Sequence, residues 1–152
     1  MKTTALTLAL LFAFNFFSLN AQDSQKDVLT DPPSEEVLAA LMYSCYVCHN
    51  PRVKSHEDII APPLIAVKYI YKFKFPEKED FVDKMTDFIL EPNNQKAILQ
   101  GPVMKFGAMP DMPMDPDQVR VISAYIYENE IEEPIWFPEY FENRHGMKWK
   151  GQ

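Results

Sequence analysis

Two cysteines and a histidine lie close together in the stretch CYVCH. They are Cys45, Cys48 and His49, and the chain has no other cysteine. On a helix, residues three and four positions apart share one face, so two thiols and one imidazole would point to the same side. Each thiol can add to one vinyl group of a porphyrin while the adjacent imidazole binds the iron. The pattern therefore predicts covalent attachment of one haem c.

Two other kinds of site use similar residues. A redox pair of cysteines belongs at the start of a helix after a strand, where the helix dipole lowers a thiol pKa, whereas this pair ends a predicted helix. A zinc site needs a fourth ligand, usually from a second Cys/His pair, and His56 and His145 are each isolated in the sequence. A disulfide between residues so close would restrain almost no chain. Haem attachment is the interpretation that these residues favour.

A haem iron in an electron carrier also needs a ligand from the opposite side of the ring. Thioether sulfur is a soft, neutral ligand that raises the reduction potential of the iron. A proline-rich loop far downstream, KFGAMPDMPM, is rich in methionine. The candidate ligands are Met104, Met109, Met112, Met114, His56 and His145.

Helices must position these residues. Ser34 followed by two acidic residues predicts a helix start, and apolar residues at helical spacing continue it over 35–48. Pro63 at a first-turn position predicts a second helix to about Phe73. Prolines bracket a third predicted helix in PEKEDFVDKMTDFILEP, and Asp115 and Pro116 start a last one over 116–130. The residues predicted to be buried are Val37, Leu38, Leu41, Met42, Cys45, Val67, Ile70, Tyr71, Phe81, Met85, Phe88, Ile89, Val119, Ile122 and Ile126.

The remaining segments are predicted to be irregular. A loop over 50–62 follows the cysteine pair because Pro51 blocks continuation of the helix. The segment GPVMKFGAMPDMPMDP is too rich in proline for regular structure, and we expect it to be a loop. The aromatic, proline-rich tail 131–152 is expected to pack over the surface of the domain. No alternation of strands and helices is present, so the predicted fold class is all-α.

The N-terminal residues have the order of a secretory signal. One cation precedes an apolar run that is too short to span a bilayer comfortably, and 1–21 is predicted to be a signal peptide followed by a flexible leader over 22–33. The chain carries 15 basic and 22 acidic residues, for a net charge of −7. This acidic balance argues against nucleic acid as a partner. After cleavage we expect no transmembrane span and one compact domain.

Four motifs resemble those of a known family. The sequence has CYVCH, then APPL, then GAMPDMPMD, and then AYIY within the last predicted helix. In this order they are similar to the haem motif, the proline turn, the Met-Pro step and the Tyr-Ile pair of small bacterial monohaem class I cytochromes c. The resemblance covers about 34–130, and the tail 131–152 has no counterpart in the minimal family fold. It implies a class I cytochrome c fold, with helices around one covalently attached haem.

The resemblance also implies roles for individual residues. Cys45 and Cys48 would be the thioether anchors, and His49 would be the proximal iron ligand. Pro62 would stand at the family's proline position, whose carbonyl accepts the other ring N–H of the histidine and fixes its tautomer. Met109, which precedes a proline and lies six residues before Asp115, would be the distal ligand. Its main rival is Met112, and the residues expected to support the pocket are Pro62, Leu64, Phe106 and Tyr125.

The function expected from these observations is electron transport. The protein would carry single electrons in the periplasm of a Gram-negative bacterium, without being an enzyme, as a monomer or in weak complexes with redox partners. One alternative is a haem subunit or dedicated donor bound to a particular oxidoreductase, and another is a gas-binding or peroxidatic haem protein with an open distal site. A cluster of Lys68, Lys72, Lys74 and Lys78 could steer an acidic partner, but a solvated helix face is the simpler expectation.

Overall fold

The computed structural model describes residues 35–152, and this part of the chain contains helices and no strand, which confirms the all-α prediction. The predicted signal segment 1–21, the leader 22–33 and the Ser34 helix start lie outside the described residues. None of the described helices is both long and apolar enough to cross a membrane. The elements are α1 (Glu35–Ala40), the π-helical turn η1 (Leu41–Cys45), the 3₁₀ turn η2 (His56–Asp58), α2 (Leu64–Lys74), α3 (Lys78–Leu90), α4 (Gln100–Phe106), α5 (Pro116–Glu128) and α6 (Phe137–His145).

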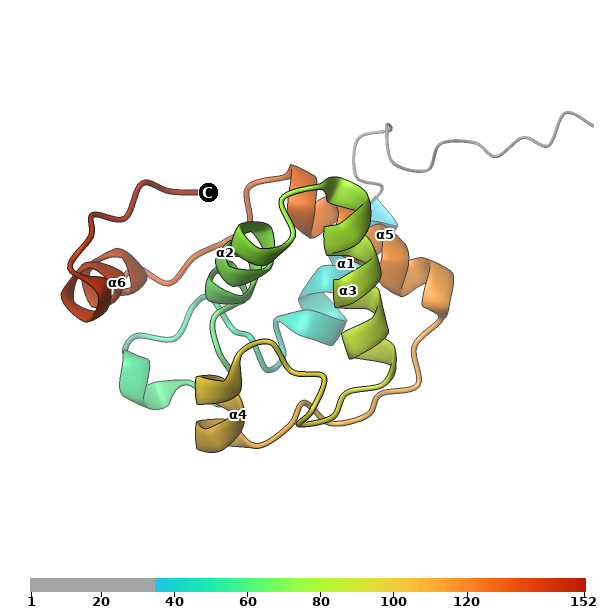
Figure 1. Ribbon diagram of the computed structural model, residues 1–152, viewed down its shortest axis with the longest axis horizontal. Helices are drawn as coiled ribbons and strands as arrows, with labels where there is room; N and C mark the ends of the chain where they lie inside the picture. Colours follow the sequence, from blue (N-terminus) through green and yellow to red (C-terminus); the bar gives the residue numbers. More distant parts are fainter. Residues whose placement is uncertain (1–34) are drawn as a thin grey trace, which may run out of the picture.

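Helices α3 and α5 pack side by side and provide the main core (Figure 1). Their buried residues recur at helical spacing, as the sequence predicted, so each helix presents one apolar face. The start of α5 is also as predicted: the Asp115 side chain accepts the Gln118 N–H at 3.0 Å, and Pro116 occupies the first turn. The buried residues of the two helices are Phe81, Val82, Met85, Thr86, Val119, Ile122, Ser123, Ala124 and Ile126.

The first helix is shorter than predicted. The α-helix ends at Ala40 and the chain continues as a π-helical turn, in which the Tyr46 N–H donates to the Leu41 carbonyl, five residues back, at 3.0 Å. Leu41 is buried, but Leu38 and Met42 are 38% and 46% exposed. The prediction of one regular helix over 35–48 is therefore wrong beyond Ala40, and the buried face is narrower than the pattern indicated.

Part of the proline-rich segment that was predicted to be a loop is helical. Residues 100–106 form α4, and Pro102 is tolerated because it lies in the first turn, where its missing N–H has no partner within the helix. Gly107 ends α4 at a φ of +83°, in the left-handed region that favours glycine, and its N–H donates to the Val103 carbonyl at 2.9 Å. Only the rest of the segment, up to Asp115, is irregular as expected.

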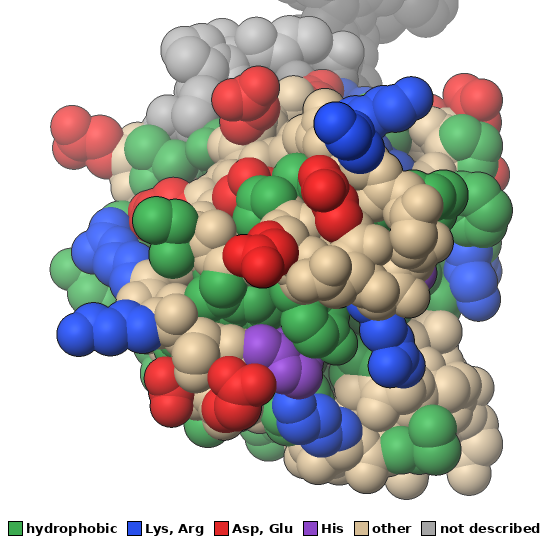
Figure 2. Space-filling model, turned by 90° about the vertical axis from the view of Figure 1, so that its left-hand side faces the viewer, with side chains coloured by type: hydrophobic (Ala, Val, Ile, Leu, Met, Phe, Trp, Pro, Cys, Tyr) green, Lys and Arg blue, Asp and Glu red, His purple; other side chains and the backbone are tan. Residues whose placement is uncertain are grey.

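The C-terminal segment, residues 131–152, does more than cover the surface. It contains α6, which lies at the left of Figure 1. Phe137 and Phe141 are buried in the same hydrophobic cluster as residues of α2, α3 and α5. The Trp149 ring packs against the rings of both phenylalanines, with centroids 5.1 and 4.9 Å apart. On this side of the molecule, hydrophobic side chains and charges of both signs are interspersed (Figure 2).

A buried lysine ties the C-terminal segment to α2. Lys68 is only 3% exposed, and its Nζ donates to the Asn129 carbonyl at 2.6 Å and to Gln152 Oε1 at 2.8 Å. The Gln152 amide also pairs with the backbone of Ile131: Oε1 accepts the Ile131 N–H at 2.9 Å, and Nε2 donates to the Ile131 carbonyl at 2.6 Å. The buried Lys68 amine therefore has two hydrogen-bond acceptors, as expected for a buried polar group.

The four lysines predicted to form one solvated face have different surroundings. Lys68 is buried, and the Lys72 ammonium lies over the Tyr127 ring, 4.6 Å from its centroid. Lys78 forms an ion pair with Glu128 on α5, whereas Lys74 is exposed. The prediction of a single solvated basic cluster is wrong, because positions 68 and 72 turn toward neighbouring elements.

Truncation at the centre of the α3–α5 pair should strongly destabilise the protein. Phe81 has no exposed surface, so Phe81→Ala should lower the free energy of unfolding by about 3–5 kcal/mol. The matched control is Phe73→Ala, because Phe73 is 79% exposed and its removal should change stability by less than about 0.5 kcal/mol. Urea unfolding followed by circular dichroism measures both, and equal losses would contradict this description of the core.

The buried Lys68 should make stability depend on pH. Burial, helped by the neighbouring Lys72 charge and opposed by Glu130, lowers the Lys68 pKa from 10.5 to about 8. Between these values the unfolded chain keeps a proton that the folded protein has released. The free energy of unfolding should therefore rise with pH across this window, approaching about 1 kcal/mol per pH unit.

Comparison with Lys68→Met isolates this contribution from those of other groups that titrate in the same range. Urea unfolding of both proteins at several pH values from about 7 to 10 gives the two stability curves. The wild-type curve should rise more steeply above about pH 8. Parallel curves would show that Lys68 titrates alike in the folded and unfolded chains.

Candidate functional site

The two cysteines and the histidine lie in a tight turn at the end of η1. The Cys45 carbonyl accepts two backbone hydrogen bonds, from the Cys48 N–H at 3.2 Å and the His49 N–H at 2.9 Å. These bonds continue helical geometry for one turn after the regular helix has ended, so residues three and four positions apart still face the same way. All three side chains line one cavity, as the spacing predicted.

The His49 ring is held by the chain that leads into α2. Its Nδ1 lies 2.6 Å from the Pro62 carbonyl oxygen, and because a carbonyl only accepts, Nδ1 must carry the proton. Burial lowers the His49 pKa, while the hydrogen bond to Pro62 opposes this shift. The neutral ring therefore keeps its lone pair on Nε2, the form in which imidazole binds a metal. This is the hydrogen bond that the resemblance implied for Pro62.

The cavity is large and predominantly apolar. The empty volume between its walls, including the solvent space at its open mouth, is about 1260 Å³. Every described α-helix except α1 and α6 contributes to the walls. The lining residues are Ser44, Cys45, Cys48, His49, Ile60, Ala61, Pro62, Leu64, Val67, Tyr71, Met85, Phe88, Ile89, Ala97, Ile98, Leu99, Pro102, Val103, Phe106, Gly107, Ala108, Met109, Pro110, Met112, Met114, Val119, Ile122 and Ile126.

Three of the four candidate methionines reach this cavity. Met109, Met112 and Met114 line it from the irregular segment between α4 and α5, whereas Met104 is not among the lining residues and is 83% exposed. The two candidate histidines are also elsewhere: the His56 ring stacks on Tyr140 with centroids 4.2 Å apart, and the His145 ring packs on Phe141 at 4.6 Å. The cavity therefore combines two thiols and an imidazole with three thioethers from a segment far away in the sequence.

The residues expected to support the pocket divide into two groups. Pro62, Leu64 and Phe106 line the cavity. Tyr125 is not among the lining residues and instead packs, half-buried, against the hydrophobic cluster. Tyr71, which the sequence predicted to be buried, also contributes to the wall from α2.

Apart from Phe106, sequence reasoning missed the wall that precedes and includes α4. Leu99, Val103 and Phe106 line the cavity, and the preceding Ala97 and Ile98 extend the same wall. Leu99, Val103 and Phe106 are spaced by four and three residues, which is a helical signal in the sequence. The prolines and Gly101 obscured this signal, because both residue types disfavour the interior of a helix. Pro102 does not break α4, since proline is tolerated in the first turn.

The Cys45 thiol is poorly suited to redox exchange. No disulfide joins Cys45 and Cys48, and burial raises the Cys45 pKa to about 11. Thiol exchange proceeds through the thiolate, and a raised pKa keeps Cys45 protonated at neutral pH. Among the described residues, no group of three or more His, Cys, Asp and Glu side chains gathers in a way that could hold a metal ion. The donor set and the apolar walls fit a bulky apolar cofactor better than a zinc ion.

Comparisons with protein-family models, curated proteins and solved structures find no match for this chain. The resemblance to class I cytochromes c therefore depends on the short motifs CYVCH, APPL, GAMPDMPMD and AYIY.

The raised pKa of Cys45 predicts slow alkylation. In a Cys48→Ser variant isolated with Cys45 as a free thiol, labelling by iodoacetamide near neutral pH should be about 100-fold slower than for free cysteine, because so little thiolate is present. The rate should keep rising toward pH 11. Mass spectrometry follows the labelling, and a rate equal to that of glutathione would contradict the buried environment of this thiol.

Proposed function

We propose that the protein is a monohaem c-type cytochrome of class I that carries single electrons. The observation that carries the proposal is the 2.6 Å hydrogen bond from His49 Nδ1 to the Pro62 carbonyl, at the wall of an apolar cavity that both thiols also line. A neutral imidazole with a fixed tautomer is what an axial iron ligand requires. The N-terminal signal pattern supports a site of action in the periplasm of a Gram-negative bacterium.

Each chemical group of the cavity has a role in this proposal. The thiols of Cys45 and Cys48 would form the thioether bonds to haem, and His49 would be the proximal iron ligand. Met109 would be the distal ligand, with Met112 as its rival; the two lie in the same segment and both face the cavity. A bound haem would supply the one-electron chemistry of its iron. The fold that encloses it would be the class I cytochrome c fold over 34–130.

The polypeptide contributes three things to electron transfer. The apolar walls exclude water from the site, and the hydrogen bond at Pro62 keeps the proximal ring in one orientation. The Met-Pro segment lines the cavity without regular backbone structure. Electron partners would be other redox proteins, met in brief encounters of small area whose strength depends on salt.

A second candidate function is a haem subunit or dedicated donor that stays bound to one oxidoreductase. The C-terminal segment favours it, because Ile135 is 91% exposed and Met147 is 55% exposed on an element outside the cavity walls. Exposed apolar side chains of this kind are common at protein interfaces. Co-purification with one enzyme at high salt would support this candidate, and a protein that stays monomeric and exchanges electrons with many partners would exclude it.

Optical spectroscopy and mass spectrometry of the exported protein test the main proposal. The wild-type protein should carry the mass of one covalent haem, and Cys45→Ser/Cys48→Ser should carry none. In Met109→Ala the methionine-to-iron charge-transfer band should disappear and the ferrous form should bind carbon monoxide rapidly, because a ligand position has opened.

Met112→Ala and Met104→Ala are the matched controls. Both should keep the charge-transfer band if Met109 is the ligand, and Met104→Ala should keep it in every case because Met104 lies outside the cavity. A band that survives Met109→Ala but not Met112→Ala would transfer the role to Met112. Wild-type protein without covalent haem would overturn the proposed function.

A further inference from the structure

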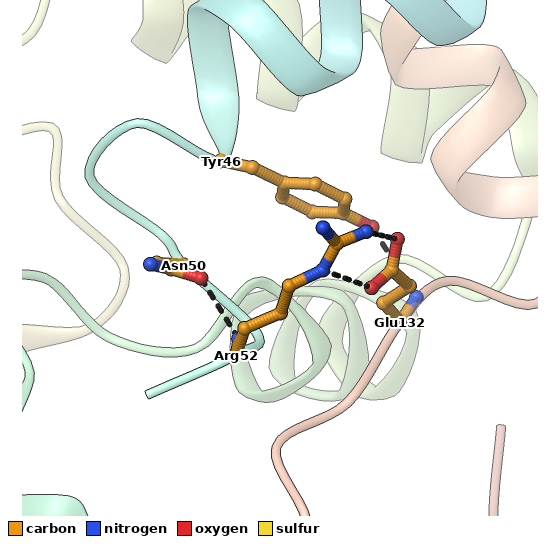
Figure 3. A network of polar contacts seen from close by, with 4 residues as sticks. All are labelled: Tyr46, Asn50, Arg52 and Glu132. Atoms are coloured by element: carbon orange, nitrogen blue, oxygen red, sulfur yellow. Dashed lines mark hydrogen bonds and ion pairs between the residues drawn. The ribbon is translucent and has the colours of Figure 1, made fainter. Parts of the chain in front are cut away.

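The C-terminal segment contacts the chain on both sides of His49 through one residue. The backbone N–H of Glu132 donates to the Tyr46 hydroxyl at 3.2 Å. The Glu132 carboxylate accepts from Arg52, from Nε at 3.3 Å and from Nη2 at 3.4 Å. Tyr46 lies three residues before His49 and Arg52 three residues after it. Glu132 therefore joins the two ends of the turn that carries the histidine (Figure 3).

The turn itself is stiffened next to these contacts. The Asn50 side chain accepts the Arg52 backbone N–H at 2.8 Å, which closes a local turn directly after His49 (Figure 3). Pro51, between them, is buried. The Arg52 guanidinium is consequently held on a short, constrained piece of chain, so a restraint on this side chain also acts on the backbone that follows the histidine.

Glu132 is well anchored on its own side. It follows Ile131, which is buried and has both of its backbone polar groups bonded to the Gln152 side chain. Pro134, two residues later, is fully buried. Beyond it, the Trp136 Nε1–H donates to the Val53 carbonyl at 3.1 Å, which gives a second contact to the same loop. The segment that presents Glu132 is thus fixed to the core of the domain.

We propose that Glu132 is a positioning residue for His49: it links Tyr46 and Arg52 to the anchored C-terminal segment and so holds the imidazole against the Pro62 carbonyl. The role of the positioned ring as an iron ligand rests on the proposed function. The hydrogen bond that is protected belongs to the polypeptide itself. Arg52 and Glu132 are largely exposed, at 71% and 48% of their side-chain surface, so their pair adds little to overall stability. The effect of this ion pair should be confined to the turn that carries His49.

The test is the rate at which the His49 Nδ1 proton exchanges with solvent, measured by NMR on the isolated protein. This exchange requires the bond to Pro62 to open. Glu132→Gln should raise the rate about two- to fivefold, the factor expected when one exposed charge pair no longer restrains a local opening. Arg52→Gln should raise the exchange rate by a similar factor. The double variant should exchange only slightly faster than either single variant, because both substitutions remove the same interaction.

Tyr46→Phe tests the other side of the link, because it removes the hydroxyl that accepts the Glu132 N–H. It should also raise the exchange rate. The matched control is Arg120→Gln, which removes another exposed ion pair, between Arg120 and Asp83, on the α3–α5 side of the molecule. The control should leave the exchange rate at the wild-type value. In haem-loaded protein, Glu132→Gln should also shift the reduction potential, and Arg120→Gln should not.

The outcomes separate this inference from the proposed function. Equal exchange rates in Glu132→Gln and Arg120→Gln would overturn the positioning role, whether both are unchanged or both are raised. Absence of covalent haem in the wild-type protein would overturn the proposed function instead. The exchange comparison would still decide the positioning role in that case, because it follows a hydrogen bond within the polypeptide.

Discussion

A large apolar hollow imposes the constraint on which this structure depends. Its lining side chains come from many segments of the chain, so the backbones that carry them must be fixed by contacts made outside the cavity. Helices α3 and α5 meet this need by packing on each other through residues such as Phe81 and Ile122. The walls drawn from α2, α4 and the irregular segments are then arranged around that pair. The cavity is a product of the whole domain, and no single element forms it.

The segments that line the cavity differ in how firmly they are held. His49 is restrained by the Cys45 carbonyl, by Pro62 and, through neighbouring residues, by Glu132. The three methionines lie in a segment without regular secondary structure. In the proposed cytochrome this asymmetry has a use, because a fixed imidazole sets one ligand while a proline-stiffened loop supplies a thioether. The C-terminal segment strengthens the restraint on His49 from outside the cavity.

Predictions from sequence succeeded where local signals and burial agree. In α5, Asp115 and Pro116 set the start and Val119, Ile122 and Ile126 mark the buried face, and all five behave as predicted. They failed where a local signal was outweighed by tertiary contacts. Prolines in the sequence concealed α4, whose apolar residues form part of the cavity wall. Lys68 is buried because Asn129 and Gln152, both far away in the sequence, accept hydrogen bonds from its amine. No periodic pattern around position 68 carries that information.

The sequence by itself determined that this protein is helical and that two thiols and an imidazole stand one turn apart. Spacing along the chain decides both, because helical periodicity and short-range geometry involve only neighbouring residues. Tertiary structure decided which distant residues share the cavity: it brought in Met109, Met112 and Met114, left Met104, His56, His145 and Tyr125 outside, and set Pro62 against His49. It also gave the tail its contact with the histidine turn through Glu132. These pairings depend on how helices pack, which side-chain burial across the whole domain determines and no local pattern encodes.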